Sequence, residues 1–89
     1  HLDLQYQVNL LELVRKLVRE DNLAVLIAMH DLNLAARYAD RVALMVAGRI
    51  QALGTPHEVL TPELISSAYC LPVHVIQHPF SGEPLVLPG

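Results

Sequence analysis

The sequence of 89 residues is short of several residue types that carry well-known chemistry: it has one cysteine, one lysine, four glycines and no tryptophan. Because Cys70 is alone, no disulfide can form within the chain, as is usual for proteins in a reducing compartment. The few glycines and the single Lys16 do not form the pattern GxxxxGK[ST], so the sequence contains no phosphate-binding loop of that kind. No apolar run approaches the ~20 residues that span a bilayer.

Charge and composition narrow the class of protein further. The formal net charge is -3, and the basic residues neither cluster nor interleave with aromatic residues, which argues against a nucleic-acid partner. Hydrophobic residues make up 53% of the chain. That share suits the interior of something larger, because so short a chain buries only a modest part of its surface. The sequence begins with HLDL instead of methionine, and we therefore expect it to be part of a longer protein.

Hydrophobic periodicity organises the first third of the chain. Apolar residues recur at helical spacing over residues 4–20, which predicts a helix with Asp3 as its N-cap. The run LAVLIAM, residues 23–29, is continuously apolar, and its length favours a strand buried on both faces, as in a parallel sheet. Asp31 can then cap a second helix over residues 32–39.

Turn and capping signals organise the rest of the chain. Gly48 can supply the positive φ of a tight turn between two strands. Thr55-Pro56-His57-Glu58 combines a capping box with proline at the first helical position, and Thr61-Pro62 opens a further helix. The predicted fold class is α/β: helix, strand and helix, then a β-hairpin and C-terminal helices. The predicted later elements are strands at 42–46 and 49–53, a helix from 61 to about 70, and strands at 73–77 and 85–87.

His30 is the first candidate for a functional residue. It follows the apolar run directly, and α/β proteins bind ligands beyond the carboxyl ends of their strands. Spacing by itself favours a plainer interpretation, in which His30 is a loop histidine hydrogen-bonded for local structure. The same holds for Asp31, whose position before the second helix is explained by capping.

Other chemical candidates are weaker. His74 and His78 have the i,i+4 spacing of metal ligands on a helix, but their β-branched neighbours predict a strand. On a strand the two would lie about 13 Å apart at ~3.3 Å per residue, too far for one zinc ion. Cys70 has no nearby base and is interpreted as a small core residue, not as a nucleophile.

The blocks HLD, MHDLNLA and ADRVALMVAGRIQALGTPHEVLT, in this order, resemble the C-terminal third of an ABC transporter ATPase. The resemblance covers nearly the whole chain, and the opening HLDLQYQ and the tail PVHVIQHPFSGEPLVLPG are similar to the ATPases of bacterial importers for iron-siderophores, haem and vitamin B12. It implies that residues 1–89 are a C-terminal fragment of an ABC ATPase domain, within the P-loop NTPase fold. The fragment would comprise the end of the D-loop, the switch-histidine region, the C-terminal helices and the tail.

The resemblance also implies roles for two residues. His30 matches the switch histidine, which in the family reaches the γ-phosphate of ATP and helps to hold the attacking water. Asp3 matches the aspartate of the D-loop, which lies at the interface between two ATPase subunits. The resemblance further implies that the parent protein uses ATP and Mg²⁺ and contacts membrane permease subunits and a second ATPase subunit. It would lie in the cytoplasm, on the inner face of the bacterial plasma membrane.

The phosphate loop, the Q-loop, the signature sequence and the catalytic glutamate of that family are not in this sequence. The fragment is therefore expected to bind no cofactor, to hydrolyse no ATP, and to associate with itself through apolar surfaces that the family covers with upstream elements. Two alternatives remain open at this point: a stand-alone α/β interaction or regulatory domain, and a small metal-dependent hydrolase built on the five histidines.

Overall fold

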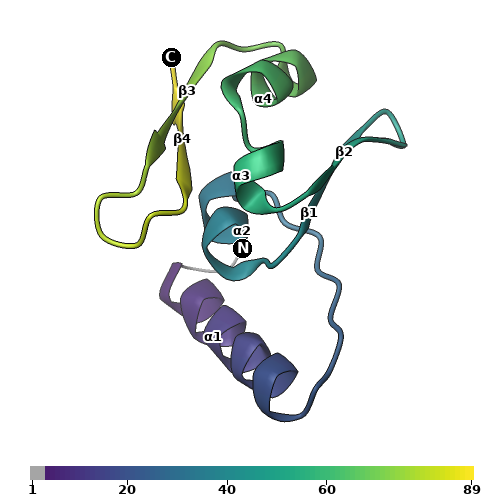
Figure 1. Cartoon of the computed structure of the whole chain (residues 1–89), viewed down its shortest axis with the longest axis vertical. Helices are drawn as coiled ribbons and strands as arrows, with labels where there is room; N and C mark the ends of the chain where they lie inside the picture. The colour runs from purple at the N-terminus through teal and green to yellow at the C-terminus, as the bar shows by residue number, and fades with distance from the viewer. Residues whose placement is uncertain (1–3) are drawn as a thin grey trace. The chain divides into compact units, whose positions relative to one another are not determined.

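The computed structural model of the chain describes residues 4–89 and divides into two compact units, residues 1–30 and residues 31–89, which we describe separately (Figure 1). Helices and strands are mixed, as the α/β prediction requires. The elements are α1 (Leu4–Glu20), α2 (Leu32–Tyr38), β1 (Val42–Val46), β2 (Arg49–Gly54), α3 (Pro56–Val59), α4 (Pro62–Tyr69), β3 (Val73–Gln77) and β4 (Pro84–Pro88).

Helix α1 has the bounds predicted from its apolar spacing. It ends where the backbone N–H of Asp21 donates to the carbonyl of Leu17 at 2.9 Å and Asn22 adopts a positive φ of 55°. Leu11 is buried, whereas Leu13 is 53% exposed. Several further apolar side chains of the helix are exposed. The described residues therefore cover only part of the apolar surface of α1. The predicted N-cap, Asp3, lies outside the described residues.

The predicted strand at residues 23–29 is not formed. This segment carries no regular secondary structure, and six of its seven residues are exposed, Leu26 to 99%. The physical reason is that a strand buried on both faces depends on neighbours: it needs hydrogen bonds on both edges and packing on both sides. Both sheets of the described residues are two-stranded and antiparallel, and neither includes this segment.

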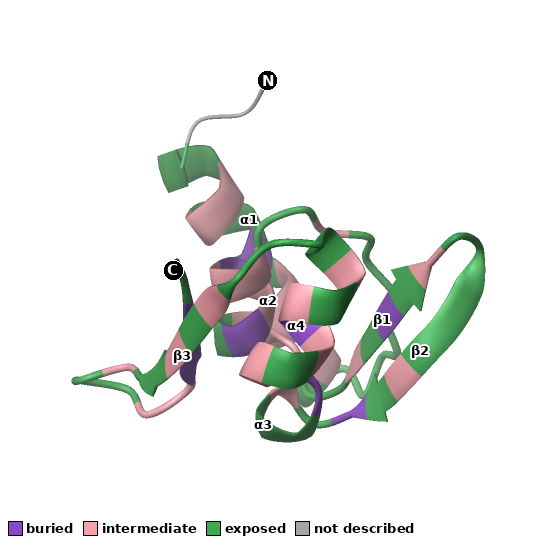
Figure 2. Ribbon diagram, turned by 90° about the horizontal axis from the view of Figure 1, so that it is seen from above, coloured by how far each residue is buried: buried purple, intermediate pink, exposed green. Residues whose placement is uncertain are grey.

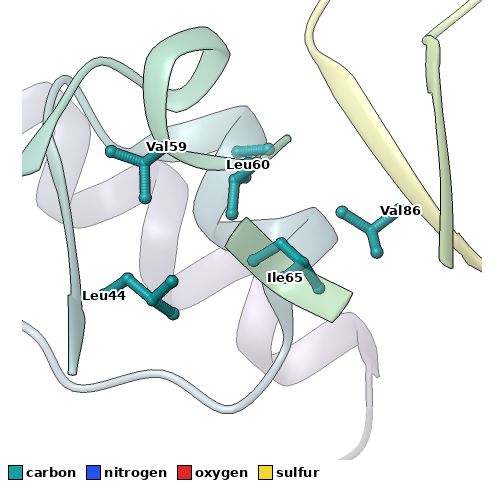
Figure 3. Packing of buried hydrophobic residues seen from close by; sticks show 6 residues of the cluster. Leu44, Val59, Leu60, Ile65 and Val86 are labelled. Carbon is teal, nitrogen blue, oxygen red and sulfur yellow. The ribbon is translucent and has the colours of Figure 1, made fainter. Parts of the chain in front are cut away.

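Residues 31–89 form the second unit around one apolar cluster (Figure 3). Val59, Leu60 and Ile65 are only 1% exposed, and Leu44 from β1 and Val86 from β4 complete the cluster together with Ala36. Helices and both hairpins therefore contribute to a single core. Figure 2 shows the contrast with β2, which is mostly exposed.

The hairpin of β1 and β2 turns at Ala47 and Gly48, whose φ angles are 52° and 77°. A two-residue turn with positive φ at both positions matches the twist of the two strands. The sequence predicted this conformation for Gly48 but not for Ala47. The pairing is interrupted after Leu44, which pairs with Ala52 while Met45 pairs with Ile50, so Gln51 is the extra residue of a bulge.

The caps of the helices follow the sequence closely. Asp31 accepts from the N–H groups of Asn33 and Leu34 at 3.0 and 3.1 Å and so starts α2. Thr55 and Glu58 form the predicted capping box: the Thr55 N–H donates to Glu58 Oε1 at 2.8 Å, and the Glu58 N–H donates to Thr55 Oγ1 at 3.3 Å.

Helix α4 ends at Cys70, as predicted, but the prediction that Cys70 is a core residue is wrong. Its thiol is exposed. The reason is local: Cys70 is the residue that leaves the helix in the left-handed conformation, with φ 53°, while its N–H still donates to the carbonyl of Ser66. The residue at this position ends the helix and does not continue its buried face.

The hairpin of β3 and β4 has a closed outer edge along β4. His78 with Glu83 and Gly89 with Pro72 are hydrogen-bonded pairs. By alternation, the positions of Pro84, Val86 and Pro88 turn their backbone groups away from β3. The two prolines therefore lose no ladder hydrogen bond, and they present no N–H on the outer side of the strand.

The one N–H that remains on this edge, that of Val86, is bound by a side chain. It donates to Asn33 Oδ1 at 2.7 Å, and Asn33 Nδ2 donates to the Val86 carbonyl at 3.2 Å. The carboxamide of a residue in α2 thus pairs with the backbone of β4 as another strand would. Across the hairpin, the Val73 N–H of β3 donates to Ser66 Oγ of α4 at 3.2 Å.

We predict that Asn33→Ala lowers the free energy of unfolding by roughly 1–3 kcal/mol, because both backbone groups of Val86 lose their partners at a part-buried position. Urea denaturation followed by circular dichroism measures the change. Gln51→Ala, at an exposed position of the same unit, is the matched control and should stay within the error of the wild type. Equal stability of all three proteins would show that water replaces the Asn33 amide without cost.

A second prediction concerns the capping box. The hydrogen bonds from the backbone and side chain of Thr55 lower the pKa of Glu58. A carboxyl with a lowered folded-state pKa adds stability above its unfolded pKa, and this stability is lost as the pH falls through the folded value. Wild type should therefore be more stable than Glu58→Gln at pH ~7, and the gap should narrow as the pH falls below the unfolded value of about 4.3 and through the lowered folded value. Thermal melts of both proteins, with Glu63→Gln as control, test this; a gap that persists in acid contradicts it.

Candidate functional site

The candidate site centres on His30, the residue that follows the apolar segment. His30 is the last residue of the first unit, and its side chain is exposed. Its ring makes no hydrogen bond with another described residue. The plainer interpretation, a histidine bonded for local structure, therefore gains no support from residues 4–89. An exposed imidazole can donate a hydrogen bond to a ligand or accept one from it.

Asp31, the next residue, has the structural role that the sequence predicted. Its carboxylate already accepts the first free N–H groups of α2, those of Asn33 and Leu34. A helix N-terminus can bind a phosphate when these groups are free. Here a negative charge occupies them, so the start of α2 does not form a phosphate site.

Asn33 is the residue of this region that sequence reasoning missed. Its side chain is bound to the Val86 backbone through both carboxamide atoms, so the first turn of α2 is fixed to β4. A polar residue between the two leucines of the first turn of α2 was the available signal. It did not indicate the partner, which is 53 positions away along the chain.

The structure separates the remaining candidates. His74 lies in β3, and His78 follows the end of this strand, as the β-branched residues around them predicted. Among residues 4–89, no three side chains of His, Cys, Asp or Glu come together in a group that could hold a metal ion. None of the described helices has the length and apolar character needed to cross a membrane. Asp3 lies outside the described residues, so its predicted position at a subunit interface stays a prediction.

The chain is similar in sequence to a set of bacterial import proteins. It is 48% identical over 86 residues to the hemin import ATP-binding protein HmuV of Photobacterium damselae subsp. damselae, which covers 97% of this chain and 32% of that protein. It is 42% identical over 88 residues to the protein of the same name from Vibrio vulnificus, with 99% and 34% covered. The chain thus spans about a third of the length of the curated relatives it matches. No family model matches it.

The fold agrees with these matches. A solved inward-facing structure, assigned to the metal-chelate type of ABC transporter, superposes with a TM-score of 0.83 and 24% identity. The match covers 99% of this chain and 36% of that one, and at this identity it shows the fold alone. Taken together, sequence and fold show that the chain corresponds to the C-terminal part of ABC transporter ATP-binding proteins and resembles the ATPases of iron-siderophore, haem and vitamin B12 importers.

Proposed function

We propose that this chain forms the C-terminal part of the ATP-hydrolysing subunit of a bacterial importer for haem or a related chelate, an iron-siderophore or a corrinoid. The observation that carries the proposal is the match of nearly the whole chain to hemin import ATP-binding proteins at up to 48% identity. The rival of a stand-alone interaction or regulatory domain does not explain why the match runs through HDLNLA and continues to the tail.

In this proposal His30 is the residue of the described chain that contacts nucleotide. Phosphoryl transfer requires hydrogen-bond donors where negative charge develops, and an exposed imidazole can supply one. Residues 4–89 do not fit a complete site for ATP and Mg²⁺. The sequence has no glycine-rich loop with lysine, and the N-terminus of α2 is filled by Asp31. The phosphate-binding groups must come from other parts of the complete subunit.

The partners follow from the same proposal. A complete subunit would pair with a second ATPase subunit, with Asp3 near that interface, and would dock on membrane permease subunits at the cytoplasmic face of the plasma membrane. The present chain offers one of the donors that the reaction needs, so by itself it neither hydrolyses nor tightly binds ATP.

The experiment that tests the proposal places residues 1–89 in a complete subunit. They replace the matched segment of the Photobacterium damselae hemin import ATP-binding protein, and ATP hydrolysis is measured. We expect the chimera to be active and His30→Ala to lower kcat by about 10²–10³-fold, with nucleotide affinity nearly unchanged, because a group that acts in the transition state affects turnover and not binding.

His57→Ala is the matched control, because His57 is also exposed and lies on α3. It should leave turnover unchanged. The 89-residue chain with His30 intact should show no turnover. An active His30→Ala chimera would remove His30 from the reaction, and an inactive but well-folded wild-type chimera would contradict the proposed function itself.

The exposed apolar residues of the first unit support a second proposal, that the isolated chain associates with itself. Leu4 and Leu13 of α1 are 64% and 53% exposed, and Leu26 is almost fully exposed. Apolar patches larger than a few hundred Å² are rare on soluble monomers. A second copy of the same surface is the simplest cover, and it gives a two-fold dimer.

Light scattering at micromolar concentration measures this association. We expect the mass of a dimer for the wild type and of a monomer for Leu13→Lys, which places a charge on the exposed face of α1. Ile50→Lys, a matched change at an exposed apolar position of β2, should remain dimeric. A monomeric wild type, with a cooperative melt that does not depend on concentration, would rule the dimer out.

A further inference from the structure

The loop that joins β3 and β4, residues 78–83, is closed by its own backbone. The His78 N–H donates to the carbonyl of Glu83 at 2.8 Å, and the His78 carbonyl accepts from the N–H of Gly82 at 3.0 Å. Gly82 has a φ of 83°, which a glycine adopts without strain. These bonds fix the two ends of the loop and leave Phe80 and Ser81 at its tip.

The tip is held by the His78 ring. Its Nδ1 accepts from the backbone N–H of Phe80 at 3.2 Å and from that of Ser81 at 3.3 Å, and it lies 3.0 Å from Ser81 Oγ. An amide N–H can only donate. Nδ1 must therefore carry a lone pair in this conformation, so the ring is neutral and its proton is on Nε2.

We propose that His78 is a pH-sensitive latch for the tip of this loop: the neutral ring holds Phe80 and Ser81 as the structure shows, and protonation of Nδ1 releases them. The added proton occupies the lone pair that accepts both backbone N–H groups. The new Nδ1–H then faces two other donors, while the acceptor already beside it is Ser81 Oγ. Two backbone hydrogen bonds are lost, and only the contact with Ser81 Oγ can be kept.

The charged groups around the ring do not cancel this effect. Ser81, through its hydrogen bond, lowers the pKa of Glu83, and a protonated His78 ring and the charge of Arg37 on α2 act in the same direction. The ionised Glu83 attracts an imidazolium, and so does the Phe80 ring, whose centroid is 6.0 Å from that of His78. Neither group provides an acceptor for the Phe80 and Ser81 N–H groups, so neither replaces the two bonds that protonation of Nδ1 breaks.

Apart from the hydrogen bond between Ser81 and Glu83, little holds the tip once the ring is charged. Phe80 is 94% exposed, so its side chain is not packed into the core of the unit. Release of the tip should therefore leave the β3–β4 pairing and the Asn33–Val86 bonds intact.

Nuclear magnetic resonance on the full chain tests the latch. At pH about 7.5, correlation of the ring nitrogens should show His78 with its proton on Nε2. On lowering the pH to about 5, the amide signals of Phe80 and Ser81 should shift with the same midpoint as the His78 ring. His74, an exposed histidine on β3, is the internal control: its titration should not move those amides.

Two variants separate the acceptor from the charge. The change His78→Asn keeps a short side-chain acceptor for the following N–H groups but removes the ring nitrogen that can be protonated. His78→Asn should therefore keep the Phe80 and Ser81 amides in their high-pH positions down to pH about 5. His78→Ala removes the acceptor and should show the released signals at both ends of the range. A proton on Nδ1 at high pH, or loop amides that do not follow the His78 ring in the wild type, would overturn the proposal.

Discussion

Two hydrogen bonds between the Asn33 carboxamide and the Val86 backbone connect the first and the last elements of residues 31–89. The apolar cluster around Leu60 and Ile65 pulls these elements together, but apolar burial is not directional and does not fix how a strand is aligned along a helix. The carboxamide fixes this alignment, because its donor and its acceptor both bind the backbone of Val86 and not that of an adjacent residue of β4. The arrangement of the C-terminal hairpin against α2 depends on this pair.

The elements that could be predicted from the sequence are those whose cause is local. Helix α1, the capping box of Thr55 and Glu58, and the turn at Gly48 each follow from residues within a few positions of one another. The bonds from Asn33 to Val86 and from Val73 to Ser66 could not be predicted, because the presence of an amide or a hydroxyl in the sequence does not show which distant residue it will bind. The bulge at Gln51 could not be predicted either, because its position depends on the register between β1 and β2.

Residues 23–29 show the opposite limit. The apolar run predicted a strand buried on both faces, and this prediction was wrong: neither sheet of the described residues pairs with the segment, and most of its side chains are exposed. The candidate site has a limit of its own. His30 could be selected from its place after the run and from the family motif, whereas its proposed chemistry requires groups that this sequence does not contain. The geometry of residues 4–89 shows an accessible imidazole, and the proposed role comes from the relatives.

The prolines of β4 have a consequence for how molecules of this kind can assemble. Pro84 and Pro88 leave the outer side of β4 without donors, and Asn33 occupies the backbone of Val86 between them. Another strand cannot add on that side, so growth of this sheet is confined to the side of β3. Two such hairpins could join once, edge to edge, and the four-stranded sheet would then end in β4 on both sides. A ribbon that lengthens without limit, as in a fibril, is excluded at this hairpin by the same residues that fix it to α2.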